Sequence, residues 1–337
     1  MKSSTRSSAP TVRDVAALAG VSPMTVSRTM SGGLNVRPEV QDRVFKAVRE
    51  LGYRRNNSAR NTRLGRPTGL VGIAVTNIGN PYYGQFALGV EEVAGEFGRQ
   101  IVVGNTGEDP DRERELLADF AGRQIEGLIL VPAGNGLELP DASRLAGVPL
   151  VLASRTIDGL AADTVLVDDI GGARSGTQVL LDDGHTRIAF LGDVAGISTT
   201  RRRYEGFRSA LNDAGIGVDE GLLAPCRNAD GAEAEVRRLL AIQNQPTAFF
   251  STNNRTTVGA LRAICDYRDR HPGSPVPALA CFDDVELADL LKVPLTVMSH
   301  DPKELGKQAA RLLFDRLTGS FAAGPRDVQI SVAIHRY

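Results

Sequence analysis

The sequence predicts a small all-α helix-turn-helix head followed by an α/β core of two doubly wound lobes. The first observation is the distribution of charge. Residues 1–66 contain 13 Lys and Arg against four Asp and Glu, a balance of +9, whereas the whole chain of 337 residues carries −1. The second is helical periodicity over residues 11–53. The third is the alternation of β-branched apolar runs with helical segments from residue 69 onward, which is typical of parallel sheets covered by helices.

The expected domain boundaries follow from these changes in pattern. We expect a basic disordered tail, a helix-turn-helix domain, a hinge segment with a linker, and a core for ligand binding and dimerisation. Their ranges are 1–10, 11–55, 56–68 and 69–337. Within the core, the first lobe is expected to take about 69–168 and 299–324, and the second lobe about 169–298 and 325–337.

The head begins with two short helices joined by a tight turn. Thr11 is a plausible N-cap, and Asp14 stands three residues later, where a capping-box acid can reach back. Gly20 can adopt the positive φ that a tight turn requires. Ser22 then caps a second helix that opens with Pro23 at its first position. Helix, turn and helix therefore fit within about 20 residues.

The second helix has small and polar side chains at its start, which suits insertion into a DNA major groove. Arg28 can pair with O6 and N7 of guanine, a contact that discriminates between bases by about 1–3 kcal/mol. Hydroxyl groups in the first turns suit contacts to phosphates. A third helix is expected over 38–51, ended by Gly52. The expected DNA contacts of the second helix are Ser22, Pro23, Met24, Thr25, Ser27 and Arg28.

The core alternates strands and helices twice over. Strands are expected at 70–75, 101–103, 128–131, 188–191, 222–224, 248–250 and 278–282. Helices are expected near 84–98, 111–123, 169–181, 203–214 and 258–268, with another ending at 240. A pair of doubly wound lobes places a ligand cleft at the carboxyl ends of the strands.

Several classes of protein are excluded by what the sequence lacks. No run of 18 apolar residues could span a membrane, and no apolar segment follows the basic start, so we expect a cytoplasmic protein without a membrane partner. Cys226, Cys265 and Cys281 are odd in number and widely spaced, which favours reduced thiols. The motifs GxSxG, GxxxxGK[ST], GxGxxG and HExxH are absent and the four His are dispersed. We expect no catalytic residue, no metal site and no cofactor.

The head resembles the DNA-binding headpiece of the LacI/GalR family of bacterial repressors. The matching motifs are Val21–Arg28, Glu50–Tyr53 and Ala59 with Arg60. The resemblance implies a hinge helix near 56–63 that folds on DNA and wedges a leucine into the minor groove. Thr62 occupies that leucine position and Leu64 lies two residues later, so a shifted register and a weaker kink both remain open. The hinge contacts implied are Asn56, Ala59, Arg60, Thr62 and Leu64.

The core is similar to the same family's sensor domain, which is like the periplasmic sugar-binding proteins. The resemblance rests on Asn80–Tyr83, Gly184-His185, Arg203 with Gly206-Phe207, Asn253-Asn254 and Phe282–Asp284. It implies effector contacts at Tyr82, Tyr83, Ser154, Arg203, Asn253, Asp283 and His300. Such a set of donors, acceptors and aromatic faces suits a polyol.

The pocket departs from the family's common pattern at three places. Ser154 and Asn254 stand where acids are usual, and no aromatic lid is found around Asn228. The resemblance therefore leaves the effector open between a sugar, a phosphorylated or carboxylated derivative, and a purine.

Together these features predict a sequence-specific transcriptional regulator, a repressor of carbohydrate genes whose operator affinity depends on a small ligand. One headpiece buries little surface, so we expect a homodimer on a near-palindromic operator. A solute-binding protein would have no use for the basic head, and an architectural DNA-binding protein would not need the cleft.

Overall fold

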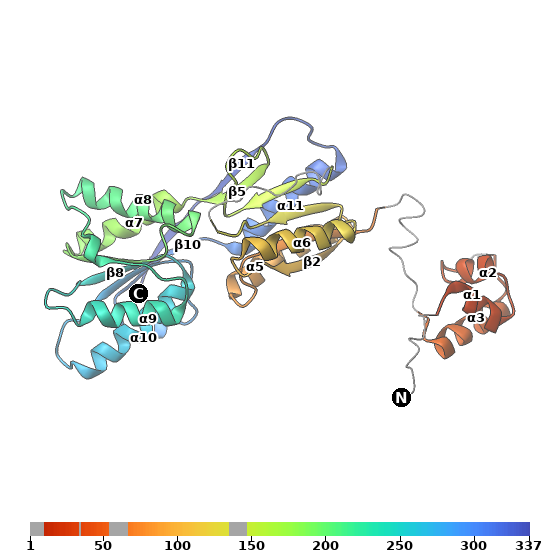
Figure 1. The fold of residues 1–337 in the computed structure, drawn as a ribbon, viewed down its shortest axis with the longest axis horizontal. Coiled ribbons are helices and arrows are strands. Elements are labelled where there is room, and N and C mark those ends of the chain that lie inside the picture. Colours follow the sequence, from red (N-terminus) through yellow and green to blue (C-terminus); the bar gives the residue numbers. More distant parts are fainter. Residues whose placement is uncertain (1–9, 34, 54–66, 135–146) are drawn as a thin grey trace. The chain divides into compact units, whose positions relative to one another are not determined.

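The computed structural model describes residues 10–33, 35–53, 67–134 and 147–337. The chain forms two compact units, Met1–Thr68 and Gly69–Tyr337, which are considered separately below (Figure 1). The expected hinge contacts at Asn56, Ala59, Arg60, Thr62 and Leu64 lie outside the described residues. No helix in the described ranges is long and apolar enough to cross a membrane.

The first unit contains the helices α1 (Val12–Ala19), α2 (Pro23–Thr29) and α3 (Pro38–Leu51). Thr11 and Asp14 form the expected capping box, and Gly20 ends α1 with a φ of 65°. Ser22 caps α2 by accepting a hydrogen bond from the Thr25 N–H. The three helices share a small core made of Val15, Ala16, Ala19, Val26, Val44 and Ala47.

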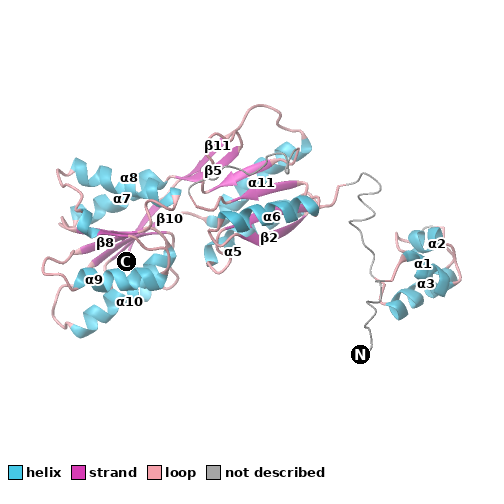
Figure 2. Ribbon diagram, in the orientation of Figure 1, coloured by secondary structure: helices cyan, strands magenta, loops and turns pink. Residues whose placement is uncertain are grey.

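The second unit contains two six-stranded sheets (Figure 2). The sheet of the first lobe has the order β11-β5-β4-β3-β1-β2, and all its pairs are parallel. Its strands are β1 (Leu70–Val75), β2 (Gln100–Asn105), β3 (Gly127–Leu130), β4 (Leu150–Ala153), β5 (Asp163–Val167) and β11 (Asp327–Ile330). Its helices are α5 (Pro81–Glu96), α6 (Pro110–Gly122) and α11 (Pro302–Thr318).

The sheet of the second lobe has the order β12-β10-β9-β8-β6-β7. All its pairs are parallel except β12 with β10, which is antiparallel. Its strands are β6 (Ile188–Leu191), β7 (Leu223–Ala224), β8 (Ala248–Ser251), β9 (Ala278–Phe282), β10 (Leu295–Ser299) and β12 (Ala333–Arg336). Its helices are α7 (Asp169–Asp182), α8 (Ser198–Asp213), α9 (Ala229–Leu240) and α10 (Asn254–Arg270).

The central strands of each sheet are buried on both faces because helices cover both sides, and successive strand residues point to opposite sides. In β1, Val71 and Ile73 pack in the cluster that contains Val90 of α5, whereas Ala74 packs in the cluster that contains Phe120 of α6. The second lobe repeats this arrangement, with α7 and α8 against one face and α9 and α10 against the other. This explains why the strands read as continuous apolar runs.

The helix pairs on each sheet approach closely where glycine removes a side chain. A Cβ on Gly89 of α5 would lie 2.0 Å from the Lys303 carbonyl oxygen of α11. A Cβ on Gly206 of α8 would lie 2.2 Å from the Ile170 carbonyl oxygen of α7. The two lobes therefore use the same packing device at equivalent helix pairs.

One predicted boundary is wrong. Residues 325–330 were expected in the second lobe, with the last crossover near 324, but β11 pairs in parallel with β5 at the edge of the first sheet. The Arg326 backbone N–H and guanidinium donate to Asp163, and the Asp168 N–H donates to the Ile330 carbonyl. The last crossover therefore lies at 331–332, between β11 and β12. The other two crossovers lie near 168 and 300–301.

Candidate effector cleft and DNA-binding helix

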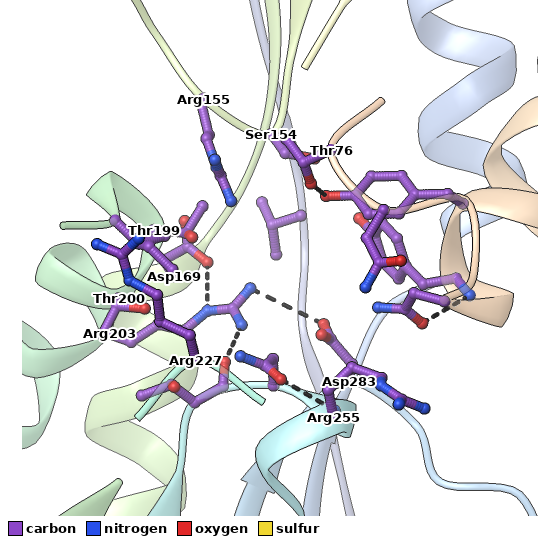
Figure 3. A pocket seen from close by; sticks show the side chains of 18 residues that line it. Thr76, Ser154, Arg155, Asp169, Thr199, Thr200, Arg203, Arg227, Arg255 and Asp283 are labelled. Carbon is purple, nitrogen blue, oxygen red and sulfur yellow. Dashed lines mark hydrogen bonds and ion pairs between the residues drawn. The ribbon is translucent and has the colours of Figure 1, made fainter. Parts of the chain in front are cut away.

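A pocket lies between the two lobes of the second unit, where the carboxyl ends of strands from both sheets meet (Figure 3). Thr76 follows β1, and Ser154 follows β4 on the first lobe. Thr252 follows β8, and Asp283 follows β9 on the second lobe. Ligands of open α/β sheets bind at such strand ends.

Arg203 of α8 is the central charged group of the pocket. It is buried, and its Nε donates to Asp169 Oδ1 at 2.8 Å while its Nη1 donates to the Thr252 carbonyl oxygen. Its guanidinium also packs over the ring of Phe282 at 3.9 Å. Asp169 accepts further hydrogen bonds from Arg202. Arg203 is thereby fixed in one orientation, with Nη2 directed toward Asp283 at 3.8 Å (Figure 3).

Asp283 has a buried carboxylate oxygen that lacks a partner. Asp283 is 8% exposed, and its Oδ1 makes no hydrogen bond with any part of the chain that the structure describes. This oxygen lies 3.8 Å from Arg203 Nη2 and 4.0 Å from His300 Nδ1, both beyond hydrogen-bond length. A buried carboxylate oxygen is strongly destabilising unless it is hydrogen-bonded. The site is therefore suited to a ligand that donates a hydrogen bond there.

The backbone is strained where two of the predicted contact residues leave their strands. Asp283 has a φ of 65° and Ser154 a φ of 62°, the left-handed region that residues with a Cβ adopt infrequently. Each is held by a sheet hydrogen bond, from the Asp283 N–H to the Met298 carbonyl and from the Ser154 N–H to the Val165 carbonyl. Such strain is typical of functional sites.

The two tyrosines form the aromatic part of the first-lobe wall. Their rings meet edge to face with centroids 5.2 Å apart. Thr76 Oγ1 donates to the Tyr83 hydroxyl at 2.8 Å, and the Tyr82 hydroxyl shares a hydrogen bond of 3.0 Å with His300 Nε2. Burial raises the pKa of the Tyr82 hydroxyl well above its ordinary value and lowers the pKa of the His300 imidazole. His300 is not among the residues that line the pocket; it lies behind Tyr82 and supports it.

Asn253 has two possible roles. It is the N-cap of α10, and its Oδ1 accepts from the N–H groups of Arg255 and Thr256 at 2.9 and 3.0 Å. The oxygen is thus used by the helix, which leaves the amide Nδ2 available to a ligand in the pocket that Asn253 lines.

Asn254 makes a reciprocal amide pair across the cleft. Its Nδ2 donates to Asn80 Oδ1 at 2.8 Å, and Asn80 Nδ2 donates back to Asn254 Oδ1 at 3.0 Å. Asn80 caps α5 on the first lobe, whereas Asn254 begins α10 on the second. The Asn254 amide therefore links the two lobes.

Sequence reasoning missed several residues of the pocket wall. Arg155 is 5% exposed and pairs through two nitrogens with both oxygens of Glu108 at 2.7 Å. Asp169, which the sequence predicts only as the start of a helix, also lines the pocket. Arg227 and Arg255 also line the pocket. Arg227 stands directly before Asn228, where the absence of an aromatic lid was the available signal.

The α2 helix of the first unit has one buried face and one exposed face. Val26 and Thr29 are buried, whereas Met24 and Arg28 are exposed. Ser22 Oγ accepts from the Thr25 N–H at 3.1 Å and shares a hydrogen bond with Thr25 Oγ1, so this hydroxyl serves the cap. Within the described ranges no ion pair occupies Arg28, so its guanidinium is free to contact a polyanion. Pro23 lies exposed at the start of α2, and Ser27 is half-buried.

The fold and pocket define a two-lobed ligand-binding protein joined to a helix-turn-helix unit. Residues 11–56 match the family described as bacterial regulatory proteins, lacI family, and residues 177–336 match the periplasmic binding protein-like domain.

Individual relatives span nearly the whole chain. The HTH-type transcriptional regulator CelR of Thermobifida fusca is 34% identical over 322 residues, covering 92% of each chain. The ribose operon repressor of Escherichia coli (strain K12) is 32% identical over 312 residues, covering 91% of this chain and 93% of the relative. The solved transcriptional regulator CelR-cellobiose complex superposes with a TM-score of 0.71 at 30% identity, covering 97% of this chain and 99% of that one.

The chain belongs to the LacI family of bacterial regulatory proteins and is a DNA-binding transcriptional regulator. The family and the fold class predicted from the sequence are confirmed.

Proposed function

We propose that the protein represses transcription as a homodimer on a near-palindromic operator, and that a polyhydroxylated small molecule in the cleft changes its affinity for that operator. The observation that carries the effector part is the buried Asp283 Oδ1, which faces Arg203 and lacks a hydrogen-bond donor in the described part of the chain. Hydroxyl groups are suitable donors to this oxygen. The cellobiose named for the CelR complex supports a carbohydrate or a derivative of one.

Each lobe has a distinct role in this proposal. On the second lobe, Arg203, Asn253 and Asp283 bind the hydroxyl groups of the ligand. Tyr82, Tyr83 and Ser154 form the opposing wall on the first lobe, with His300 as a positioning residue behind Tyr82. The protein works in the cytoplasm and catalyses no reaction.

Effector control acts through the three crossovers between the lobes. A ligand that contacts both walls favours one relative orientation of the lobes over another, and only such a difference in affinity can shift the equilibrium. Because β1 begins directly after the linker, a change in the first lobe reaches the chain that leads to the DNA-binding unit. A ligand that weakens operator binding acts as an inducer, and one that strengthens it acts as a corepressor. Measuring operator affinity with and without the ligand distinguishes the two.

The first test is thermal melting against sugars, sugar derivatives and purines. A ligand present at 100 times its Kd stabilises the folded state by about 2.7 kcal/mol. Asp283→Asn keeps the shape but removes the charge, and we expect at least about a tenfold loss of affinity, since hydrogen bonds to charged groups contribute about 1.5–3 kcal/mol. Asp284→Asn, an exposed neighbour, is the matched control. A hit that survives Asp283→Asn unchanged would contradict the assigned role, and a purine hit of that kind would favour the purine alternative.

The second test concerns DNA recognition by the outer face of α2. We expect Arg28→Ala to lower affinity for an operator selected from a random pool by about 1–3 kcal/mol, because one bidentate base contact is lost. Affinity for unrelated DNA and its salt dependence should change little. Lys46→Ala, an exposed cation on α3, is the control. Equal weakening on all DNA would assign Arg28 to phosphate contact instead.

A further inference from the structure

Arg202 connects the two lobes at a point beside the pocket. It lies on α8 of the second lobe, and its side chain is 22% exposed. Its Nη2 donates to the Ser154 carbonyl oxygen at 2.8 Å, and Ser154 follows β4 on the first lobe. Arg202 is not among the residues that line the pocket. This hydrogen bond therefore depends on how the lobes are arranged, and a ligand does not have to touch Arg202 for the bond to form or break.

The same guanidinium shares a carboxylate with Arg203, the central charged group of the pocket. Arg202 Nε and Nη2 donate to Asp169 Oδ2 at 2.9 and 2.5 Å, and Arg203 Nε donates to Asp169 Oδ1 at 2.8 Å. Asp169 is 2% exposed and lines the pocket. Charge-assisted hydrogen bonds are short and strong. The position of Asp169, and with it that of Arg203, therefore depends on Arg202.

Each end of this link is attached to the framework of one lobe. The Ser154 N–H donates to the Val165 carbonyl of β5, which fixes Ser154 to the first-lobe sheet. Asp169 is the first residue of α7 on the second lobe, directly after the crossover near 168. Because N–H···O hydrogen bonds span about 2.7–3.2 Å, a rotation that moves the lobes apart here breaks the bond between Arg202 and Ser154. The arrangement in which this bond is formed is the closed one.

Arg202 differs from the other contacts near it. Arg201, the preceding residue of α8, is exposed. The amide pair of Asn80 and Asn254 also joins the lobes, but both of its hydrogen bonds are neutral. A hydrogen bond from a charged donor contributes more than a neutral one, so the Arg202 contact is the stronger connection per bond.

We infer that Arg202 is a positioning residue that holds the lobes in the closed arrangement through Ser154 and holds Asp169 in place for Arg203. This inference rests on the proposed function, because it names a residue through which the cleft controls operator affinity. Without Arg202, Asp169 keeps Arg203 as a partner, but the second lobe loses its charged donor to the first-lobe backbone. The equilibrium between closed and open lobes then shifts toward the open arrangement.

The experiment measures the arrangement of the lobes in the full chain without any ligand. Fluorescent dyes are attached at Ile78→Cys and Asp230→Cys in a Cys265→Ser background, since Cys226 and Cys281 are buried. Ile78 is 62% exposed after β1, Asp230 is exposed on α9, and neither is among the residues that line the pocket. Single-molecule energy transfer is recorded with an excess of unlabelled chain, so that a homodimer carries one labelled pair.

Matched variants assign the closed arrangement to this contact. Arg202→Met removes the donors but keeps a long side chain, and we expect the ratio of closed to open molecules to fall at least about fivefold. Arg202→Gln takes its place if that variant does not fold. Arg202→Lys keeps a charged donor, so its distribution should lie closer to that of the labelled parent. Arg201→Met removes an exposed cation from the same helix and should change nothing.

Operator affinity, measured without ligand on the operator selected from a random pool, separates this inference from the proposed function. Distances that stay unchanged in Arg202→Met, or change equally in Arg201→Met, would overturn the inference and leave the proposed function intact. Changed distances with unchanged operator affinity would support the inference but contradict control of operator binding by lobe orientation. A change in both, restored by Arg202→Lys, supports both.

Discussion

The two lobes of the larger unit share one architecture, but one lines the cleft mainly with neutral side chains and the other with charged ones. Both have a six-stranded sheet with helices on both faces and glycine at the closest helix contacts. The first lobe presents neutral groups, among them Tyr82, Tyr83 and Ser154, and its Arg155 is neutralised by Glu108. The second lobe presents a charged wall centred on Arg203 and Asp283. The comparison shows that the sheet and its helices fix the position of the residues that line the pocket, whereas the identity of the residues after each strand determines the chemistry of that lining.

The charged wall is possible because a buried network holds it. Asp169 is 2% exposed and accepts hydrogen bonds from both Arg202 and Arg203. Removing one partner of a buried ion pair leaves the other charge uncompensated, which costs more than the pair itself contributes. The first lobe likewise neutralises the cation of its wall, Arg155, through two hydrogen bonds to Glu108.

The largest expected effect is on the second lobe's network. Asp169→Ala leaves two guanidinium groups without their carboxylate, so the free energy of unfolding should fall by about 3–5 kcal/mol. Asp213→Ala, which breaks an exposed pair with Arg174, should change it by at most about 1 kcal/mol. Urea denaturation of the three proteins measures both values. Equal losses would show that the buried network is no more critical than a surface pair.

The first lobe offers a pH-dependent contrast at Glu113. Burial raises the pKa of this carboxyl from 4.5 to about 7, despite the hydrogen bond that it accepts from the Ala133 N–H. The folded state therefore binds the proton more tightly than the unfolded state. The resulting stability is fully present below about pH 4.5 and is lost as the pH rises to about 7.

Glu113→Gln tests that window. The variant keeps an oxygen acceptor for Ala133 but cannot ionise, so its melting temperature should lose less than that of the wild type between pH 4.5 and 7. Glu115→Gln, exposed on the same helix, should follow the wild-type profile. Parallel profiles for all three proteins would mean that Glu113 ionises without penalty.

The smallest expected effect concerns the amide pair that joins the two lobes. Asn254→Ala removes two neutral, half-buried hydrogen bonds to Asn80, but water can satisfy the Asn80 amide in the pocket that it lines, so the free energy of unfolding should fall by less than about 1 kcal/mol. We expect little change in unfolding but faster ligand dissociation, because the closed arrangement loses support. Asn254→Asp keeps the acceptor for Asn80 Nδ2 and loses the donor, so it should be intermediate. Stopped-flow measurements of ligand dissociation compare the wild type, Asn254→Ala and Asn254→Asp. Identical rates would show that the Asn80–Asn254 pair does not stabilise the closed cleft.

The local features of the head could be read from the sequence alone. The capping box of Thr11 and Asp14, the positive φ of Gly20 and the cap at Ser22 depend on residues within a few positions of one another. Most central strands of the core were also predictable, because buried strands read as continuous apolar runs, whereas the largely exposed edge strands β11 and β12 were not predicted. The pocket contacts implied by family resemblance were placed at the same cleft, except that His300 lies behind Tyr82.

What could not be predicted depends on neighbours far apart in the chain. Strand β11 joins the first lobe because Arg326 meets Asp163, a partner 163 residues away. The pairs of Asn80 with Asn254 and of Arg155 with Glu108 likewise have no local signature.

The sequence by itself determined the family, the helical head, the alternation of strands and helices over most of the core and the candidate residues at strand ends, since each follows from periodicity, capping or a local motif. Only the tertiary structure decided which carboxylates are neutralised and which retain an unpartnered oxygen. The physical reason is that charge pairing and burial depend on distances of a few ångströms between segments that the chain order does not bring together.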